Sequence, residues 1–222
     1  MVWAAAIAGL SLPASGTPTT IFNTGVVSQS PLMLAAAGAV DLHYSLIASA
    51  DAGGPGPTAY VAGPNGVYPI PPWLLNGPDS NWISPFVAAG TSATMGTYTY
   101  RTTFDLSGPL AGTAVLTGRW ATDNTGEMVL NGVSLGITSG GFLAWSPFTI
   151  SSGFVAGLNT LDFVVTNAPG TGLNPTSLRV EISGEAGTAA PEPSTGLVVA
   201  LSLCGLAGWS RARTRQRTPT HA

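Results

Sequence analysis

Residues 97–106 alternate between two kinds of side chain, and this pattern constrains the fold more than any other feature. The even positions are mostly aromatic or apolar, and the odd positions from Thr97 to Asp105 are all polar or charged. A period of two places successive side chains on opposite faces of a β-strand. The stretch therefore predicts a strand that buries Tyr98, Tyr100 and Phe104 and exposes the side chains between them.

Six further strands are predicted downstream, with turn signals about every ten residues. Residues 123–126 predict one turn, and the pair Asn131-Gly132 is typical of a tight hairpin. The six strands are Ala114–Asp123, Glu127–Leu130, Val133–Ile137, Thr149–Val155, Thr160–Asn167 and Ser177–Ser183. Many short strands joined by regular turns predict an all-β fold, an antiparallel β-sandwich.

The N-terminal part carries weaker strand signals. Asp41–Ala48 alternates and predicts a strand, and Ile21–Val27 predicts a less distinct one. The run Pro31–Ala39 fits either a short helix or a loop.

Residues 51–95 predict a long irregular region, because Gly-Pro, Asn-Gly and Pro-Pro pairs recur there. A loop of this length is unusual within a compact domain. We expect Trp73, Trp82 and Phe86 to hold it against the sandwich.

The pattern of residues 96–184 resembles a galactose-binding-like jelly roll, the accessory β-sandwich found beside many glycoside hydrolases. The resemblance is carried by the Asp123-Asn124 turn before a short strand that ends in Asn131-Gly132, and by Gly157–Leu161 leading into a strand. It implies a jelly-roll topology and a binding role more than a catalytic one.

The body of the chain is acidic and poor in charge. Charged residues are 8% of the sequence, and residues 1–210 hold three arginines against ten acidic residues, a formal net charge of −7. Such a body excludes nucleic acid as a partner. The single cysteine, Cys204, lies in the hydrophobic C-terminal stretch, so no disulfide is expected.

The C-terminus combines three features in order. Pro191-Glu192-Pro193 comes first, an uncharged hydrophobic stretch over 195–210 follows, and an arginine-rich end begins with Arg211 and Arg213. The seventeen uncharged residues 194–210 would span about 25 Å as a helix, slightly short of a membrane core of about 30 Å. The stretch predicts a single short transmembrane helix whose arginines stay in the cytoplasm.

These three features together resemble a PEP-CTERM sorting signal over residues 191–222. The resemblance implies an exosortase-type membrane processing enzyme as partner and a Gram-negative bacterium as host. An ordinary tail anchor with a proline-rich stem is the alternative.

The N-terminal residues 1–16 resemble the apolar core of a secretory leader, although the usual positive charges are missing. A buried N-terminal strand is the alternative. Residues 17–184 are then the β-sandwich domain, and the small residues of 185–190 form a linker. Leader and tail together imply export across the inner membrane to the cell surface or extracellular matrix.

The body offers little for catalysis. It has one histidine, His43, and no cysteine, which leaves no zinc ligand set and no nucleophile–base pair. We expect no enzyme activity and no cofactor. A calcium site at Asp123 and Asn124 is a weak candidate, since carboxylate and carbonyl oxygens are the ligands that calcium prefers.

Sugar binding is the more plausible activity, because sugars stack on exposed aromatic rings flanked by Asp, Asn or Arg. Trp120, Asp123, Asn124 and Trp145 are the candidate sugar-binding residues. The leading hypothesis is a non-enzymatic surface or matrix protein, a component of biofilm or exopolysaccharide. The alternatives are a carbohydrate-binding module that engages exopolysaccharide and, third, a glycan hydrolase acting through loops 51–95.

Overall fold

The computed structural model describes residues 16–54, 56–108 and 111–188, and this part of the chain is all β except for one short 3₁₀ turn, Ala111–Thr113. The expected leader, the Pro191-Glu192-Pro193 motif, the hydrophobic stretch 195–210 and the arginine-rich end lie outside the described residues, apart from Gly16. The strands are β1 Gly16–Thr19, β2 Val26–Gln29, β3 Leu32–Leu34, β4 Val40–Ala48, β5 Thr58–Val61, β6 Ile83–Ser84, β7 Gly96–Asp105, β8 Val115–Asp123, β9 Thr125–Leu130, β10 Val133–Ser139, β11 Ser146–Ile150, β12 Leu158–Asn167 and β13 Ser177–Gly187.

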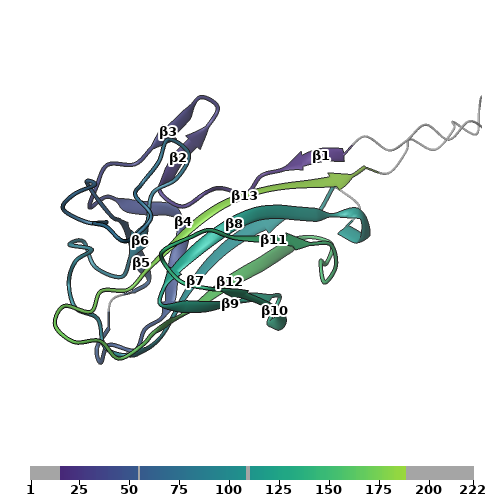
Figure 1. The fold of residues 1–222 in the computed structure, drawn as a ribbon. Coiled ribbons are helices and arrows are strands. Elements are labelled where there is room, and N and C mark those ends of the chain that lie inside the picture. Colours follow the sequence, from purple (N-terminus) through teal and green to yellow (C-terminus); the bar gives the residue numbers. More distant parts are fainter. Residues whose placement is uncertain (1–15, 55, 109–110, 189–222) are drawn as a thin grey trace, which may run out of the picture. The chain divides into compact units, whose positions relative to one another are not determined.

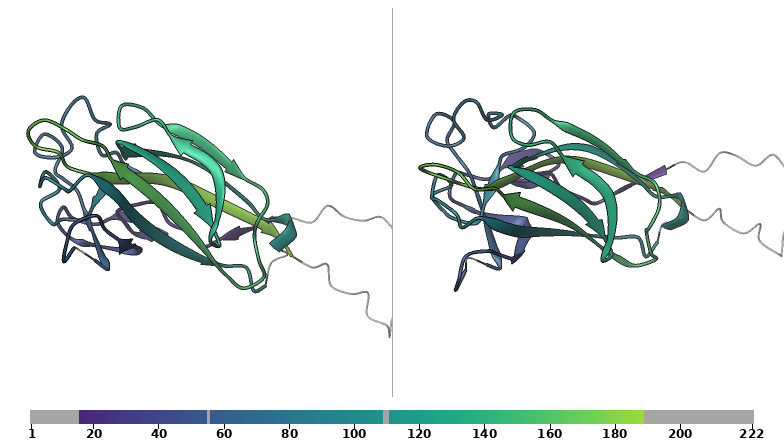
Figure 2. Two further views of the ribbon diagram at one scale, coloured as in Figure 1. Left: turned by 90° about the horizontal axis from the view of Figure 1, so that it is seen from below. Right: turned by 60° about the horizontal axis from the view of Figure 1, so that its bottom comes forward.

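The strands form two facing layers (Figure 1, Figure 2). One layer has the order β10-β9-β12-β7-β4, and the other has the order β13-β8-β11, with β1 paired to β13. The short strands β5 and β6 carry the pairing from β4 to β13. The expected antiparallel β-sandwich is therefore confirmed.

The predicted alternation of β7 matches the burial of its side chains. Tyr98, Tyr100 and Phe104 are buried, whereas Thr97 and Thr103 are exposed. Strands β12 and β13 also bury the faces expected of them, with Leu161, Phe163 and Val165 inward on β12 and Leu178, Val180 and Ile182 inward on β13. These apolar faces fill the space between the layers, which is where the core lies.

Trp120 of β8 joins the two layers at the centre of the core. Its ring lies 5.5 Å from that of Phe163 in the opposite layer, and its side chain is completely buried. Gly126 of β9 makes room for the indole, since a Cβ there would lie 2.9 Å from a ring atom of Trp120. The Trp120 indole therefore fits in the core only because residue 126 of β9 has no side chain.

The hairpin at Asn131-Gly132 is confirmed. Both residues have positive φ, 51° and 81°, as a tight two-residue turn between β9 and β10 requires. Asn131 also fixes the neighbouring strand, because its side-chain oxygen accepts a hydrogen bond from the amide of Thr160 at 3.0 Å.

The strand expected at Ile21–Val27 is confirmed only at its last two residues, which begin β2 at Val26–Gln29. Residues 20–25 instead run along the free edge of β13 between β1 and β6, held mainly by side chains. Thr24 donates its amide to the carbonyl of Val180 and accepts the amide of Val180 on its hydroxyl, and Asn23 accepts the amide of Ile182. Polar side chains here replace the ladder that a strand would form.

Three other segments differ from expectation. The ambiguous run Pro31–Ala39 contains the short strand β3, which pairs with β2, and β11 lies at Ser146–Ile150, a few residues before the predicted strand. Strand β13 continues to Gly187, where it pairs with Gly16 of β1, so the first residues of the expected linker 185–190 lie in the sheet.

The irregular region 51–95 contains only the short strands β5 and β6, as its turn signals predict. Its aromatic residues form a second cluster on the outer face of the sheet. Trp82 is fully buried there, Trp73 lies 4.8 Å from it, and both pack with Tyr68 and Ala121 of β8. The expectation that Trp73 and Trp82 hold this region against the sandwich is confirmed, and Phe86 packs against the main core.

Within residues 16–188, leaving aside 55, 109 and 110, no helix has the length and apolar character needed to cross a membrane.

Candidate functional site

The outer face of β8 and β13 carries a row of polar cross-strand pairs. Alternation points Leu178, Val180 and Ile182 into the core, so the residues between them point outward. The antiparallel register then sets the outward pairs, which are Asp123–Ser177, Ala121–Arg179, Arg119–Glu181, Thr117–Ser183 and Val115–Glu185. One end of this row lies under region 51–95, and the other end is open.

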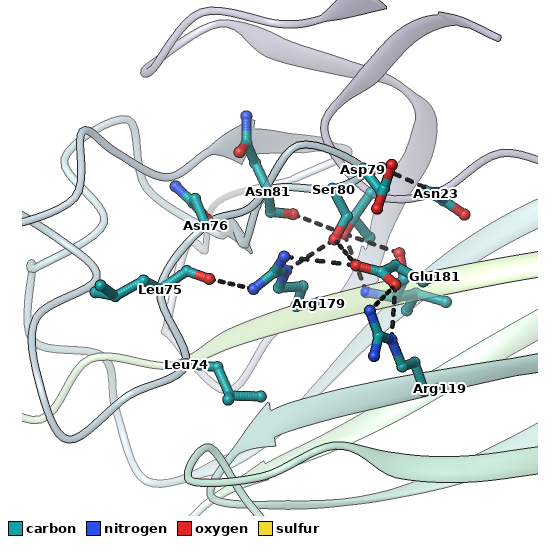
Figure 3. Close-up of polar contacts among 12 residues, drawn as sticks. Asn23, Leu74, Leu75, Asn76, Asp79, Ser80, Asn81, Arg119, Arg179 and Glu181 are labelled. Atoms are coloured by element: carbon teal, nitrogen blue, oxygen red, sulfur yellow. Dashed lines mark hydrogen bonds and ion pairs between the residues drawn. The ribbon is translucent and has the colours of Figure 1, made fainter. Parts of the chain in front are cut away.

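Arg179 is the buried cation of the row. Region 51–95, which we call the covering loop, surrounds its side chain (Figure 3). Its side chain is only 5% exposed. Its guanidinium donates to the Ser80 hydroxyl at 2.8 Å and to the carbonyl oxygen of Leu75, and it lies 3.5 Å from Glu181. Burial lowers the pKa of Arg179 to about 10, and the nearby charge of Glu181 opposes that shift.

Glu181 connects the buried end of the row to the open end. One carboxylate oxygen accepts the Ser80 hydroxyl at 2.9 Å, and the other accepts Arg119 Nε at 2.7 Å (Figure 3). The side chain of Arg119 is 48% exposed. The Glu181 carboxylate therefore contacts both the buried Arg179 and the exposed Arg119. Each of its oxygens accepts a charge-assisted hydrogen bond, one from Ser80 and one from Arg119.

Trp145 lies close to both arginines. The guanidinium carbons of Arg119 and Arg179 are each 4.6 Å from the centre of its ring, which is within the range of a cation–π interaction. The ring is half-buried and packs on the Trp73–Trp82 cluster. This contact with the Trp145 ring helps to fix the position of the Arg119 guanidinium.

An open hollow of about 440 Å³ lies over this network. We call it the Arg119 hollow. Six of its nine lining residues have polar or charged side chains, and the lining comes from β8, β11, β13 and two connecting segments. The lining residues are Asn23, Asp79, Thr117, Gly118, Arg119, Pro147, Glu181, Ile182 and Ser183. Its volume is that of a small-molecule site, with fixed hydrogen-bonding groups along its floor.

The four predicted sugar-binding residues do not form one surface. Trp120 is fully buried between the layers, so its ring is not a platform that a sugar can reach. Asp123 is 5% exposed, and burial raises the pKa of its carboxyl to about 7. The side-chain oxygen of Asn124 accepts the amide of Ala168 at 2.6 Å. Only Trp145 adjoins the hollow, through Arg119.

A calcium site at Asp123 and Asn124 gains no support from this arrangement. The Asn124 side-chain oxygen is already hydrogen-bonded, and the surroundings of Asp123 favour the uncharged acid. Across the described part of the chain, no group of three or more His, Cys, Asp or Glu side chains is placed to hold a metal ion.

The residues that sequence reasoning missed are Arg119, Glu181 and Asp79 as members of one site. Arg119 and Glu181 each occupy an outward position on a predicted strand, which identifies them as exposed and nothing more. Their contact depends on the register between β8 and β13, and no local pattern encodes it.

A second hollow of about 500 Å³ lies on the outer face of the other layer, over β4 and β7. We call it the His43 hollow. His43 and Phe22 stack in it with ring centres 3.5 Å apart, and Arg101 forms an ion pair with Asp162 beside it. Its rim is apolar, because Leu42 and Leu158 are 64% and 66% exposed.

No protein-family model matches the sequence, and no curated protein is similar enough to count as a relative. Three solved structures show a partial similarity of fold. The CBM36-1 domain of a multidomain xylanase from the hindgut metagenome of Trinervitermes trinervoides has a TM-score of 0.31 at 16% identity, covering 52% of this chain and 85% of that one. CBM35 from Paenibacillus barcinonensis has a TM-score of 0.31 at 18% identity, covering 56% and 87%. A family 35 carbohydrate-binding module from an environmental isolate has a TM-score of 0.27 at 17% identity, covering 46% and 77%. Similarity at this level assigns no ligand to the present chain.

Proposed function

We propose that this protein is a non-enzymatic carbohydrate-binding protein of the cell surface or extracellular matrix, and that it binds a saccharide in the Arg119 hollow. The observation that supports the proposal is the fixed Arg119–Glu181 pair on the floor of an open hollow of about 440 Å³, with the buried Arg179 beneath Glu181. Binding exopolysaccharide would make the protein an adhesive component of a biofilm.

The charges of this network favour a hydroxyl-rich ligand over an ion. Arg119 is the one basic residue among the lining residues described, and its charge is balanced by Glu181 at 2.7 Å. Its guanidinium keeps spare N–H donors, since the group has five in a fixed plane. Pro147 adds an apolar surface on one wall. Donors and acceptors held rigidly before binding reduce the entropy lost when a ligand is ordered.

The test is binding of the full chain to a glycan array, followed by affinity measurements on the best saccharide. We expect Arg119→Ala to weaken binding about tenfold or more, which corresponds to roughly 1.4 kcal/mol. Arg101→Ala is the matched control, because Arg101 forms a comparable ion pair with Asp162 on the outer face of the other layer. Equal affinity of wild type and Arg119→Ala would reject this site, and no binding to any glycan would reject the function.

We also propose that the chain is exported and sorted through its C-terminal signal, with an exosortase-type enzyme acting near Pro191-Glu192-Pro193. The support is the order of the three sequence features in residues 191–222. The test is the intact mass of the protein recovered outside a host with its own sorting machinery. A C-terminus near Pro193 supports processing, and a mass that retains Leu197–Arg217 contradicts it.

A further inference from the structure

Another hollow, distinct from the His43 hollow, adjoins the Arg119 hollow on the same face of the sheet. It has a volume of about 410 Å³ and is lined by Pro18, Val115, Thr117, Ser183, Gly184 and Glu185. We call it the Glu185 hollow. Thr117 and Ser183 line both hollows, so the two spaces meet at one cross-strand pair.

The boundary between the two hollows is low. Thr117 and Ser183 are exposed, their hydroxyl oxygens lie 3.3 Å apart, and both side chains are short. The two hollows therefore form one continuous groove along the outer face of β8 and β13.

The groove is longer than a single sugar site needs to be. Its floor includes three successive outward residues of β13, which are Glu181, Ser183 and Glu185. At about 3.3 Å per residue, the four steps from Glu181 to Glu185 span about 13 Å. Asn23 and Asp79 form a side wall at the Glu181 end, where Asn23 accepts the amide of Ile182.

The charge along the groove is mainly negative. Asp79 and Glu181 line one hollow and Glu185 lines the other, whereas Arg119 is the single basic residue among the lining residues described. Its guanidinium is bound to Glu181 at 2.7 Å. A polymer that carries carboxylates or sulfates would meet unfavourable electrostatics along this surface.

We propose that the groove binds an internal segment of a linear, non-acidic polysaccharide, with the chain lying along β13 across both hollows. The inference rests on the proposed function and specifies its ligand. Hydroxyls on several successive sugar units would contact the groove, and affinity would rise with chain length until both hollows are filled. A pocket for a chain end would show no such dependence.

The experiment measures binding of the full chain to neutral oligosaccharides, from monosaccharide to octasaccharide, in the gluco-, xylo- and manno- series. We expect affinity to rise by about tenfold or more between the disaccharide and the hexasaccharide of the preferred series. Polygalacturonate, an acidic polymer, is expected to bind more weakly than a neutral polymer. Equal affinity for short and long chains, or preference for the acidic polymer, would overturn the inference.

Ser183→Trp places a large ring on the shared pair and should remove the gain with chain length while short saccharides still bind. Thr97→Trp is the matched control, because Thr97 is exposed on an outward position of β7 in the other layer. If Ser183→Trp does not fold, Thr117→Tyr places a ring at the same point from β8. An unchanged length dependence in the folded variant would overturn the inference.

The outcomes separate this inference from the function on which it rests. Binding of saccharides with no effect of chain length leaves the carbohydrate-binding function intact and rejects the continuous groove. Absence of binding to any neutral or acidic glycan rejects both.

Discussion

At the scale of single residues, Glu181 and Asp123 are two carboxylates on one face of the sheet with opposite surroundings. Glu181 contacts two guanidinium groups and the Ser80 hydroxyl. Asp123 lies at the covered end of the same row, opposite Ser177, where burial disfavours its charge. The difference follows from the position of the covering loop and not from the local sequence of either residue.

Asp123 should make the stability of the protein depend on pH. Burial raises the pKa of its carboxyl from the usual 3.8 to about 7. The folded state therefore holds the proton more tightly than the unfolded state, and this contribution is complete below pH 4 and lost as pH rises from about 4 to 7. We expect Asp123→Asn to flatten that part of the stability profile.

The measurement is urea unfolding of wild type and Asp123→Asn between pH 4 and pH 8. Near pH 8 the variant should be more stable than wild type by a few kcal/mol at most, because each unit of pKa shift corresponds to about 1.4 kcal/mol. Asp105→Asn is the control, since the Asp105 carboxyl lies on the exposed face of β7 and has a lowered pKa. Parallel pH profiles for wild type and Asp123→Asn would contradict the assignment.

At the scale of elements, the two layers meet through Trp120, and the strand opposite must leave space for it. Gly126 of β9 does so, because a Cβ there would lie within 3.0 Å of Trp120 ring atoms and of Thr122. The position of Trp120 in turn sets which residues of β8 face outward, Arg119 among them. The packing of the core and the formation of the groove are therefore linked through β8.

Gly126→Ala should destabilise the fold by about 1–3 kcal/mol, since the added methyl group overpacks the core against an indole that is completely buried. The measurement is thermal or urea unfolding. Gly112→Ala is the matched control, because a Cβ at Gly112 meets nothing within 4 Å. Similar stability of the two variants would show that the layers can separate at Trp120 without cost.

Sequence reasoning identified the elements whose alternation is strong. Strands β7, β12 and β13 bury the faces that the pattern predicts, and Asn131-Gly132 forms the expected hairpin. It failed over most of Ile21–Val27, where Thr24 and Asn23 bond to the edge of β13 across more than 150 residues of sequence. The sugar-binding prediction for Trp120 is not supported, because alternation along β8 puts Trp120 on the same inward face as Leu116 and both are buried.

At the scale of the whole described unit, the sandwich separates two outer faces with different chemistry. The face of β8 and β13 has polar pairs, a continuous groove and an arginine–carboxylate network. The face of β4 and β7 has the His43 hollow with its exposed apolar rim. Region 51–95 gathers at one end of the sandwich, away from β1 and the end of β13 (Figure 2), and there covers Arg179.

Saccharide binding in the Arg119 hollow can be tested by backbone amide chemical-shift mapping of the full chain with the neutral oligosaccharide that binds best. We expect saturable shifts clustered at Thr117, Arg119, Glu181 and Ser183, with the His43 hollow unaffected. Shifts clustered at His43 and Arg101, or no saturable shifts on either face, would contradict it.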